Sequence, residues 1–415
     1  MSLTNWTRCK IGDRIEFIYG KGLPKKKRNL SGKFPVYGSN GIVDFHDEFL
    51  VAEPSIIVGR KGAAGKIHIT NKPFWPIDTT YFVTPPEDIN LNFLFYYLQT
   101  LKLEKHDRST AIPGLNREDA YSQELIYPSL EVQHHIVSKI EELFSELDKG
   151  IESLQKAKVQ LKTYRQAVLK AAFEGKLTEW WRISKQQFDL IDLKDSFSEQ
   201  EMDYFGEIPN EWKYLRSKSI IKTINNGYTP KVNFLSQDHG DIPFIKVYNL
   251  NFDGSFNFAK KPTFIPNKIH RNDLKRSITY PGDVLINIVG PPLGKVSIVS
   301  KQYPEWNINQ AIVMLRPNEL ILNKYLSYYL QNPATIRWLE STSKATAGQY
   351  NIKVTTCREI PIAYCPVEEQ KAVVQEIESR LSVCDHIEKS IDEQLLQAEA
   401  LKQSILKKAF EGRLV

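Results

Sequence analysis

The chain has 415 residues, of which 25% are charged and 41% are hydrophobic. This composition is typical of globular proteins, excludes collagen-like, disulfide-rich and wholly disordered chains, and at this length predicts two or three cores. The apolar runs are far shorter than the roughly 20 residues that span a bilayer, and residues 1–6 lack a secretory signal, so we expect a cytoplasmic location. The four cysteines lack the spacing of a zinc site, which indicates free thiols.

The formal net charge is +6, and the excess of Lys and Arg lies in residues 1–129 and 201–366, whereas residues 367–415 are acidic. A basic excess of this size is compatible with a polyanionic partner and also with many ordinary enzymes. The two basic segments are therefore where we look for a binding surface.

In chain order, short alternating apolar runs with Gly, Pro and Asn turns predict a mixed α/β domain over residues 1–129. A long helix is predicted over 130–178, followed by a polar linker over 179–200 with Trp180-Trp181 as a docking point. A second mixed α/β domain over 201–366 and a second long helix over 367–415 complete the chain. The expected fold class is α/β (mixed α+β), with two globular domains that alternate with two long helices.

An internal repeat is the strongest signal in the sequence. The residues Ala-Phe-Glu-Gly-Lys-Leu at 172–177 recur as Ala-Phe-Glu-Gly-Arg-Leu at 409–414, 237 positions later. At the same offset Gln133 meets Gln370 and Ile140 meets Ile377. The segments before the helices repeat more loosely, with aromatic residues such as Tyr97 and Tyr329 expected in the cores. We therefore expect a pseudo-two-fold repeat.

Both predicted helices carry apolar residues at mostly three- and four-residue spacing and are followed by Gly175 and Gly412, where a left-handed cap would end each helix. At 1.5 Å per residue each helix would be about 60 Å long. The apolar seam is narrow, as in a coiled coil, so we expect the two helices to pair antiparallel. The residues expected in helix pairing and subunit docking are Ile136, Ile140, Leu147, Ile151, Leu154, Leu161, Val168, Phe173, Val373, Ile377, Leu381, Ile391, Leu395, Ile405 and Phe410.

Over its full length the chain resembles the specificity subunit of a type I DNA restriction–modification system. The resemblance rests on helix entries such as Pro366-Val367-Glu368-Glu369-Gln370, on the repeated endings at 172–177 and 409–414, and on the segments 34–42 and 110–116. It implies that each domain is a target recognition domain that reads one half of an asymmetric bipartite site in double-stranded DNA. It further implies that the helices set the gap and dock two methyltransferase subunits, and that a motor-nuclease subunit joins for cleavage.

Motifs for catalysis are missing from the sequence. The two Pro-Pro pairs, at 85–86 and 291–292, lack the preceding acid or amide and the following aromatic residue of an adenine-methylation loop, so we interpret them as turns. The glycine-rich segment 59–67 does not have the spacing of a phosphate-binding loop. We expect a non-catalytic subunit without cofactor or metal of its own. S-adenosylmethionine, ATP and magnesium are expected on the partner subunits of the adenine-N6 methyltransferase and deoxyribonuclease complex.

A protein that reads duplex DNA needs cations for phosphates and planar polar groups for base edges, on loops that can enter a groove. For the charge run at 25–28 and the turn at 37–41, a solvated surface and a plain hairpin turn are equally good interpretations. The candidates in the first domain are Lys25, Lys26, Lys27, Arg28, Tyr37, Ser39, Asn40, Arg60, Lys61, Lys66, Arg108 and Asn116. Those in the second are Lys246, Tyr248, Asn249, Asn287, Lys295, Lys344, Gln349, Tyr350 and Lys353.

Two alternatives remain at this point. The chain could be a self-contained methyltransferase or nuclease with an unrecognised site, which bound S-adenosylmethionine or metal-dependent cleavage by the pure chain would favour. It could also be an adaptor whose helices bind only protein, which failure to bind any duplex would favour. The sequence does not predict which DNA sequence is read, because DNA shape contributes to recognition as well as residue type.

Overall fold

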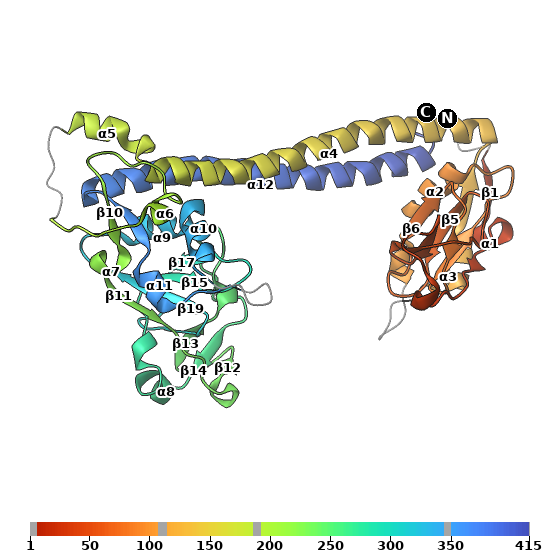
Figure 1. The fold of residues 1–415 in the computed structure, drawn as a ribbon. Helices are drawn as coiled ribbons and strands as arrows, with labels where there is room; N and C mark the ends of the chain where they lie inside the picture. Colours follow the sequence, from red (N-terminus) through yellow and green to blue (C-terminus); the bar gives the residue numbers. More distant parts are fainter. Residues whose placement is uncertain (1–5, 107–113, 186–191, 344–349, 415) are drawn as a thin grey trace. The chain divides into compact units, whose positions relative to one another are not determined.

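The structure is a computed structural model that describes residues 6–106, 114–185, 192–343 and 350–414. The chain divides into two compact units, Met1–Lys156 with Ser390–Val415, and Ala157–Lys389. Each unit holds one globular domain together with part of each long helix (Figure 1). The two units are described separately below.

The first domain contains a four-stranded sheet in the order β2-β8-β5-β6, a three-stranded sheet in the order β4-β3-β7, and the pair β1-β9. All strand pairs are antiparallel except β3 with β7. The strands are β1 (Thr7–Lys10), β2 (Ile18–Tyr19), β3 (Phe34–Gly38), β4 (Gly41–His46), β5 (Ser55–Gly59), β6 (Ile67–Thr70), β7 (Trp75–Pro76), β8 (Thr80–Val83) and β9 (Glu124–Tyr127). The helices are α1 (Ile11–Arg14), η2 (Lys25–Lys27), α2 (Leu91–Thr100), η3 (Leu103–His106) and α3 (Arg117–Tyr121).

The core of this domain forms where α2 covers the four-stranded sheet. Strand β5 is buried along its whole length, because its unbroken apolar run is covered on both faces. In α2 the buried residues Phe93, Leu94, Tyr97 and Leu98 recur at helical spacing, and the Asn90 side chain caps the helix by accepting from the backbone amide of Phe93. Tyr97 is thus a core residue, as predicted.

The second domain repeats this plan. Its four-stranded sheet has the order β11-β19-β15-β17, its second sheet has the order β12-β14-β13-β18, and β13 pairs with β18 in parallel as β3 does with β7. The strands are β10 (Lys213–Arg216), β11 (Ile221–Asn226), β12 (Ser236–Gln237), β13 (Ile242–Ile245), β14 (Thr263–Ile265), β15 (Val284–Asn287), β16 (Val289–Gly290), β17 (Val296–Ile298), β18 (Asn307–Ile308), β19 (Ile312–Pro317), β20 (Tyr350–Asn351) and β21 (Pro361–Tyr364). The helices are α7 (Ser217–Ile220), η5 (Val232–Phe234), η6 (Val247–Asn249), α8 (Asn267–Arg271), η7 (Lys275–Ser277), α9 (Asn323–Gln331), α10 (Pro333–Ser341) and α11 (Val354–Arg358). The mixed α/β class is therefore confirmed, and Tyr329 is buried as predicted.

The two long helices are α4 (Leu130–Phe173) and α12 (Val367–Phe410), each of 44 residues. Gly175 and Gly412 adopt φ values of 71° and 69°, which confirms the predicted left-handed conformation after each helix. Within the first unit Lys402 pairs with Asp148 at 2.5 Å, and within the second Arg165 pairs with Asp385 at 2.6 Å. These two ion pairs are related by the 237-residue offset, and their register shows that the helices are antiparallel.

The helix ends belong to the domain cores as well as to the helix pair. In the first unit the Phe410 ring lies 5.2 Å from that of Phe93 and 5.1 Å from that of Tyr97. In the second, the Phe173 ring lies 4.9 Å from that of Tyr329. The residues predicted for helix pairing that instead form part of these cores are Ile136, Ile140, Val168, Phe173, Val373, Ile377, Ile405 and Phe410, with Leu147 and Leu381 packed against them. Burial in the domain cores is thus a role of these residues that the sequence did not predict, beside the predicted helix pairing and subunit docking.

The segment between α4 and the second domain is held tightly at its start. It contains η4 (Lys176–Thr178), α5 (Glu179–Ser184) and α6 (Glu199–Met202). The fully buried Glu369 carboxylate accepts hydrogen bonds from Arg182 at 2.6 Å, from Thr178 at 2.8 Å and from the Trp212 indole at 2.8 Å. The first part of the predicted linker is thus a fixed helix that leaves Trp180 57% exposed.

Candidate nucleic-acid interface

In the first domain, loops at one edge of the four-stranded sheet meet. The backbone amide of Arg60, just after β5, donates to the Thr79 carbonyl at 2.9 Å, and the amide of Leu115 donates to the Arg60 carbonyl at 2.9 Å. The Ser39 hydroxyl, in the β3–β4 turn, donates to the same Thr79 carbonyl at 2.5 Å. The structure therefore brings together four loops that are far apart in the sequence.

Besides the buried Ser39, five predicted DNA-contacting residues lie on these loops: Asn40, Arg60, Lys61, Lys66 and Asn116. The Lys66 ammonium donates to the Asn40 side-chain oxygen at 2.6 Å, and both residues are exposed. Asn116 caps α3 by accepting from the Glu118 amide at 3.0 Å and is also exposed. These groups offer cationic and amide donors at one edge of the domain, as base and phosphate contacts require.

Two further residues belong to this cluster but were missed from the sequence, Tyr19 and Arg117. The guanidinium carbons of Arg60 and Arg117 lie 5.4 Å and 5.5 Å from the centre of the Tyr19 ring. Burial and a hydrogen bond with Tyr19 raise the pKa of the neighbouring Tyr81 to about 12. Arg117 directly follows the predicted contact Asn116, which is the only signal for it in the sequence, and no sequence pattern pointed to Tyr19.

Two residues predicted to contact DNA in the first domain are buried. Tyr37 is 8% exposed and packs edge-on against Phe74 with ring centres 5.7 Å apart. Ser39 is 7% exposed and its hydroxyl is already bound to the Thr79 carbonyl. Both side chains are thus engaged in contacts within the domain. The charge run Lys25, Lys26 and Lys27 forms the exposed η2, whereas the half-buried Arg28 donates to the Leu23 carbonyl.

Two residues predicted to contact DNA in the second domain are likewise buried. Asn249 is 1% exposed, and its amide donates to the carbonyls of Asn257 and Lys260. Asn287 is 2% exposed and uses its whole side-chain amide on nearby backbone groups. Both stabilise loops from within, because a buried amide must be hydrogen-bonded.

The other candidates of the second domain lie nearer to solvent. The half-buried Tyr248 donates its hydroxyl to the Lys261 carbonyl at 3.0 Å, and the Lys246 ammonium lies 6.0 Å from the Tyr248 ring. Lys295 occupies the position of Lys66 and lies 5.4 Å from the ring of Phe252, which is 51% exposed. Tyr350 is half-buried in β20, and Lys353 is exposed before α11. Arg108, Lys344 and Gln349 lie outside the described residues.

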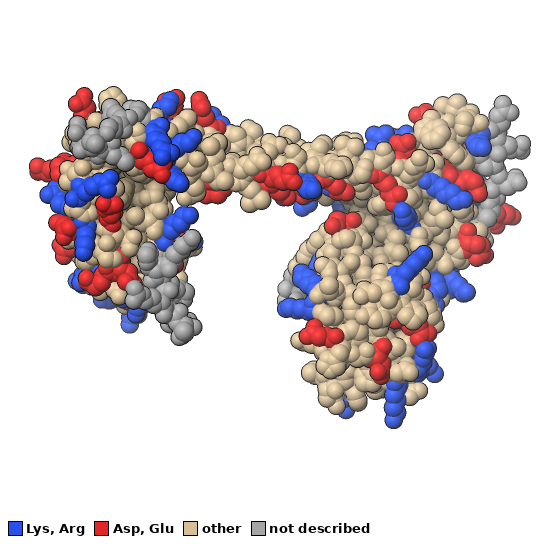
Figure 2. All heavy atoms as spheres, turned by 180° about the vertical axis from the view of Figure 1, so that it is seen from behind, with Lys and Arg blue, Asp and Glu red and all other residues tan. Residues whose placement is uncertain are grey.

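Charge on the two domains is mixed rather than concentrated. Figure 2 shows Lys and Arg side chains interspersed with Asp and Glu on the face that it draws. Among the described residues, no group of three His, Cys, Asp or Glu could hold a metal ion, and no helix there is both long and apolar enough to cross a membrane. Burial raises the pKa of Cys357 to about 12, so this thiol is not activated as a nucleophile.

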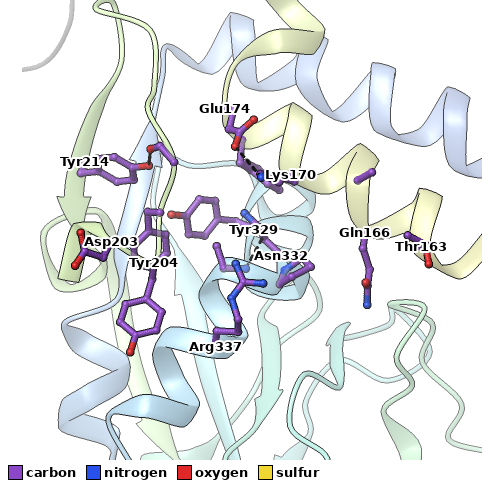
Figure 3. A pocket seen from close by; sticks show the side chains of 16 residues that line it. Thr163, Gln166, Lys170, Glu174, Asp203, Tyr204, Tyr214, Tyr329, Asn332 and Arg337 are labelled. Atoms are coloured by element: carbon purple, nitrogen blue, oxygen red, sulfur yellow. Dashed lines mark hydrogen bonds and ion pairs between the residues drawn. The ribbon is translucent and has the colours of Figure 1, made fainter. Parts of the chain in front are cut away.

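A pocket of about 420 Å³ lies in the second unit, beside the end of α4. Figure 3 shows Tyr204, Tyr214 and Tyr329 at one side of it, and Gln166 and Thr163 from α4 at the other. Lys170 pairs with Glu174 at 3.8 Å, and the Tyr214 hydroxyl donates to the Gly206 carbonyl at 2.8 Å. Lys170, Glu174 and Tyr214 are thus engaged with one another or with the backbone.

Comparison with known proteins gives a consistent picture. A family model described as the type I restriction modification DNA specificity domain matches residues 4–156 and 209–397. The type I restriction enzyme EcoBI specificity subunit of Escherichia coli is 31% identical over 317 residues, which cover 74% of this chain. This chain spans 61% of that subunit's length. The EcoDI specificity subunit of Escherichia coli is 23% identical over 419 residues, covering 99% of this chain and 89% of the subunit.

One solved structure supports the fold. It comes from work on complex assembly and conformational transition in a type I R-M system and covers 99% of this chain and 98% of its own, with a TM-score of 0.68. At 16% sequence identity the similarity concerns the fold alone.

Proposed function

The chain belongs to the family of type I restriction–modification specificity subunits, and from this membership we propose that it reads an asymmetric bipartite site in double-stranded DNA. In this family it is the specificity component and not a catalytic subunit. One observation carries the proposal: the two domains share one scaffold but differ in the side chains of the equivalent loops. A protein that reads two different half-sites needs this combination of constant frame and variable loop.

The equivalent loop positions can be assigned from backbone contacts. Leu115 donates its amide to the Arg60 carbonyl, and Ile352 donates to the Ile288 carbonyl, so Ile288 takes the place of Arg60. The Gly20 amide donates to the carbonyl of Thr80, the first residue of β8. In the same way the Gly227 amide donates to the carbonyl of Ile312, the first residue of the equivalent strand β19. The residues before these glycines, Tyr19 and Asn226, are thus equivalent and chemically different.

We also propose that two copies of one methyltransferase subunit bind the helices. Exposed apolar residues recur at the 237-residue offset: Val159 with Leu396, and Tyr164 with Leu401, each between 46% and 73% exposed. Large apolar side chains left in solvent at the same place in both repeats favour one kind of partner bound twice. S-adenosylmethionine, ATP and magnesium would be held by the partner subunits, and the complex would act in the cytoplasm.

The DNA-reading proposal is tested by methylome sequencing of cells that express this chain with its cognate methyltransferase subunit. We expect one bipartite motif with two different half-sites, and neither methylation nor cleavage by the pure chain. Replacing Lys61 with Ala should lower the salt slope of binding by about one unit if Lys61 contacts a phosphate. Methyl transfer by the pure chain, or the absence of any sequence motif, would overturn the proposal.

A matched pair of variants tests the docking proposal. The double variant Val159→Glu with Tyr164→Lys should bind one methyltransferase copy fewer than the wild type. Adding Leu396→Glu with Leu401→Lys should remove the second copy. Native mass spectrometry of the complex measures the number of bound copies. Because all four residues are exposed, the domains should stay folded. The control changes equally exposed positions, Lys162→Glu with Glu399→Lys, and should keep both copies. Unchanged stoichiometry in the first set would contradict the proposal.

A further inference from the structure

The guanidinium of Arg60 is held in one orientation with one edge left open. Its Nε and Nη2 atoms donate to the Asp78 carbonyl at 3.0 Å and 2.5 Å. This carbonyl therefore occupies the edge of the guanidinium that Nε and Nη2 form. Within the described residues Nη1 makes no hydrogen bond, so the end-on edge formed by Nη1 and Nη2 keeps its donors. That edge matches two acceptors lying in one plane, such as O6 and N7 of guanine.

Tyr19 provides the surface that fixes this group. Its ring lies over the Arg60 guanidinium at 5.4 Å, meets Tyr81 edge-on at 5.0 Å, and is 53% exposed. The Arg117 guanidinium lies over the same Tyr19 ring and over that of Tyr121, both at 5.5 Å. Stacking on aromatic rings restricts rotation of both guanidinium groups without using their donors.

The cluster keeps positive charge, because only one of its two guanidinium groups has an ion pair among the described residues, and that pair is long and exposed. Arg60 forms no ion pair among the described residues, and the carboxylate nearest Arg117 is that of Glu118, 3.9 Å away and 74% exposed. Two cations beside one exposed ring therefore attract electronegative acceptors from outside the protein.

From this geometry we propose that Arg60 reads one guanine of the half-site that the first domain binds. Tyr19 is the positioning residue that orients the Arg60 guanidinium. A phosphate contact needs charge but little orientation, whereas base reading needs a planar donor pair held at a set angle. The Asp78 carbonyl at one edge of the Arg60 guanidinium and the Tyr19 ring against its face hold the guanidinium at a set angle. The inference rests on the proposed DNA-reading function and deepens it.

The second domain has no equivalent of the Tyr19, Arg60 and Arg117 cluster among its described residues. The half-site that it reads therefore serves as an internal control. The positions of Tyr19 and Arg60 are taken in the second domain by Asn226 and Ile288. The position of Arg117 is taken by Val354, because Arg117 is the first residue of α3 and Val354 is the first residue of the equivalent helix α11. Ile288 is 4% exposed and cannot donate a hydrogen bond through its side chain. Changes to the cluster should therefore affect one half-site only.

The experiment uses the full chain in complex with its methyltransferase subunits and duplexes that carry single base-pair changes across both half-sites. Arg60→Lys keeps the charge but loses the bidentate edge. It should lower discrimination at one G·C pair of one half-site by roughly 5- to 150-fold, with an unchanged salt slope. Tyr19→Leu should weaken discrimination at the same base pair, while Tyr19→Phe, which keeps the ring, should resemble the wild type.

Discrimination at the other half-site shows in the same measurement that each variant is folded. If Arg60→Lys keeps full discrimination, the inference is overturned. It is also overturned if Arg60→Ala lowers the salt slope by about one unit and leaves discrimination intact, because both results mean that Arg60 contacts a phosphate. Loss spread over both half-sites would also overturn it. Failure of the wild-type complex to prefer any site would instead overturn the proposed function, so the two failures are distinguishable.

Discussion

Gln133 and Gln370 illustrate how one side chain joins a helix to its domain. Gln133 accepts from the Asn90 amide at 2.7 Å and donates to the carbonyls of Asp88 and Pro128 at 2.9 Å. Gln370 forms the same three contacts, with the Leu322 amide and the carbonyls of Leu320 and Cys365. Both glutamines are fully buried, which explains why they recur at the start of each helix.

Replacing Gln133 or Gln370 with Leu should destabilise the domain that contains it by about 3 kcal/mol, because an apolar side chain leaves three buried backbone groups unpaired. Chemical denaturation measures the loss. Gln155→Leu, at an exposed position of α4, is the control and should change stability by less than about 0.5 kcal/mol. Equal effects at Gln133 and Gln155 would contradict this account.

His270 links the stability of the second domain to pH. Its side chain is fully buried, with the Asn307 amide 3.0 Å from Nδ1 and the Glu305 carboxylate 3.3 Å from Nε2. Burial lowers the pKa of His270 more than the Glu305 carboxylate raises it. The folded state therefore resists protonation, whereas the unfolded chain takes up a proton near pH 6.5.

Stability should consequently be unaffected by His270 above about pH 7 and should fall as the pH drops below about 6.5, by at most about 1.4 kcal/mol per pH unit. Unfolding measured between pH 7.5 and about 5.5 tests this. His270→Gln should reduce the slope even if it lowers stability at every pH. Burial also lowers the pKa of His68 in the first domain, so His68→Gln should remove a separate part of the slope. An unchanged slope in His270→Gln would contradict the assignment.

At the scale of elements, the long helices owe their stability to packing rather than to helix propensity. Each is buried at its ends against a domain and paired along its length, and α4 tolerates a glycine in its interior. A Cβ added at Gly150 would meet no atom within 4 Å, and the residue is exposed. Gly150 thus lowers helix stability without any packing role.

Gly150→Ala should therefore raise the free energy of unfolding by about 0.5–1 kcal/mol, measured by urea denaturation. Gly65→Ala is the contrasting variant. Gly65 has φ +77° and a Cβ there would collide with the backbone of Glu104, so this substitution should destabilise the first domain. Destabilisation by Gly150→Ala would mean that the glycine serves a partner or a bend.

At the scale of the whole molecule, the uninterrupted helices are expected to set the gap between the half-sites. Inserting one heptad after Lys156 and another after Glu393 keeps the apolar spacing and lengthens each helix by about 10 Å. Methylome sequencing should return the same two half-sites, because the domains are untouched. The gap should widen by at most about three base pairs, with some loss of efficiency from DNA twist. Altered half-sites, or the old gap at full efficiency, would contradict this role.

The repeat, the mixed α/β class and the ends of the long helices could be predicted from the sequence, because these features depend on local patterns. Residues at helical spacing and glycines after the last turn act over a few positions. The sequence also predicted that Tyr97 and Tyr329 are buried, since both lie on apolar helix faces. The resemblance to the family rested on motifs such as those at 366–370, 172–177 and 409–414, which have the same local character.

Which polar side chains are exposed could not be predicted from the sequence, because exposure depends on the tertiary fold. Asn249 and Asn287 have the chemistry of a base-reading group, but the folded loops bury them and each side-chain amide forms three hydrogen bonds to nearby backbone groups. Tyr19 and Arg60 become neighbours because β2 and β5 both pair with β8, a strand that comes later in the chain. Side-chain exposure and such non-local contacts arise from strand order, which no short sequence pattern encodes.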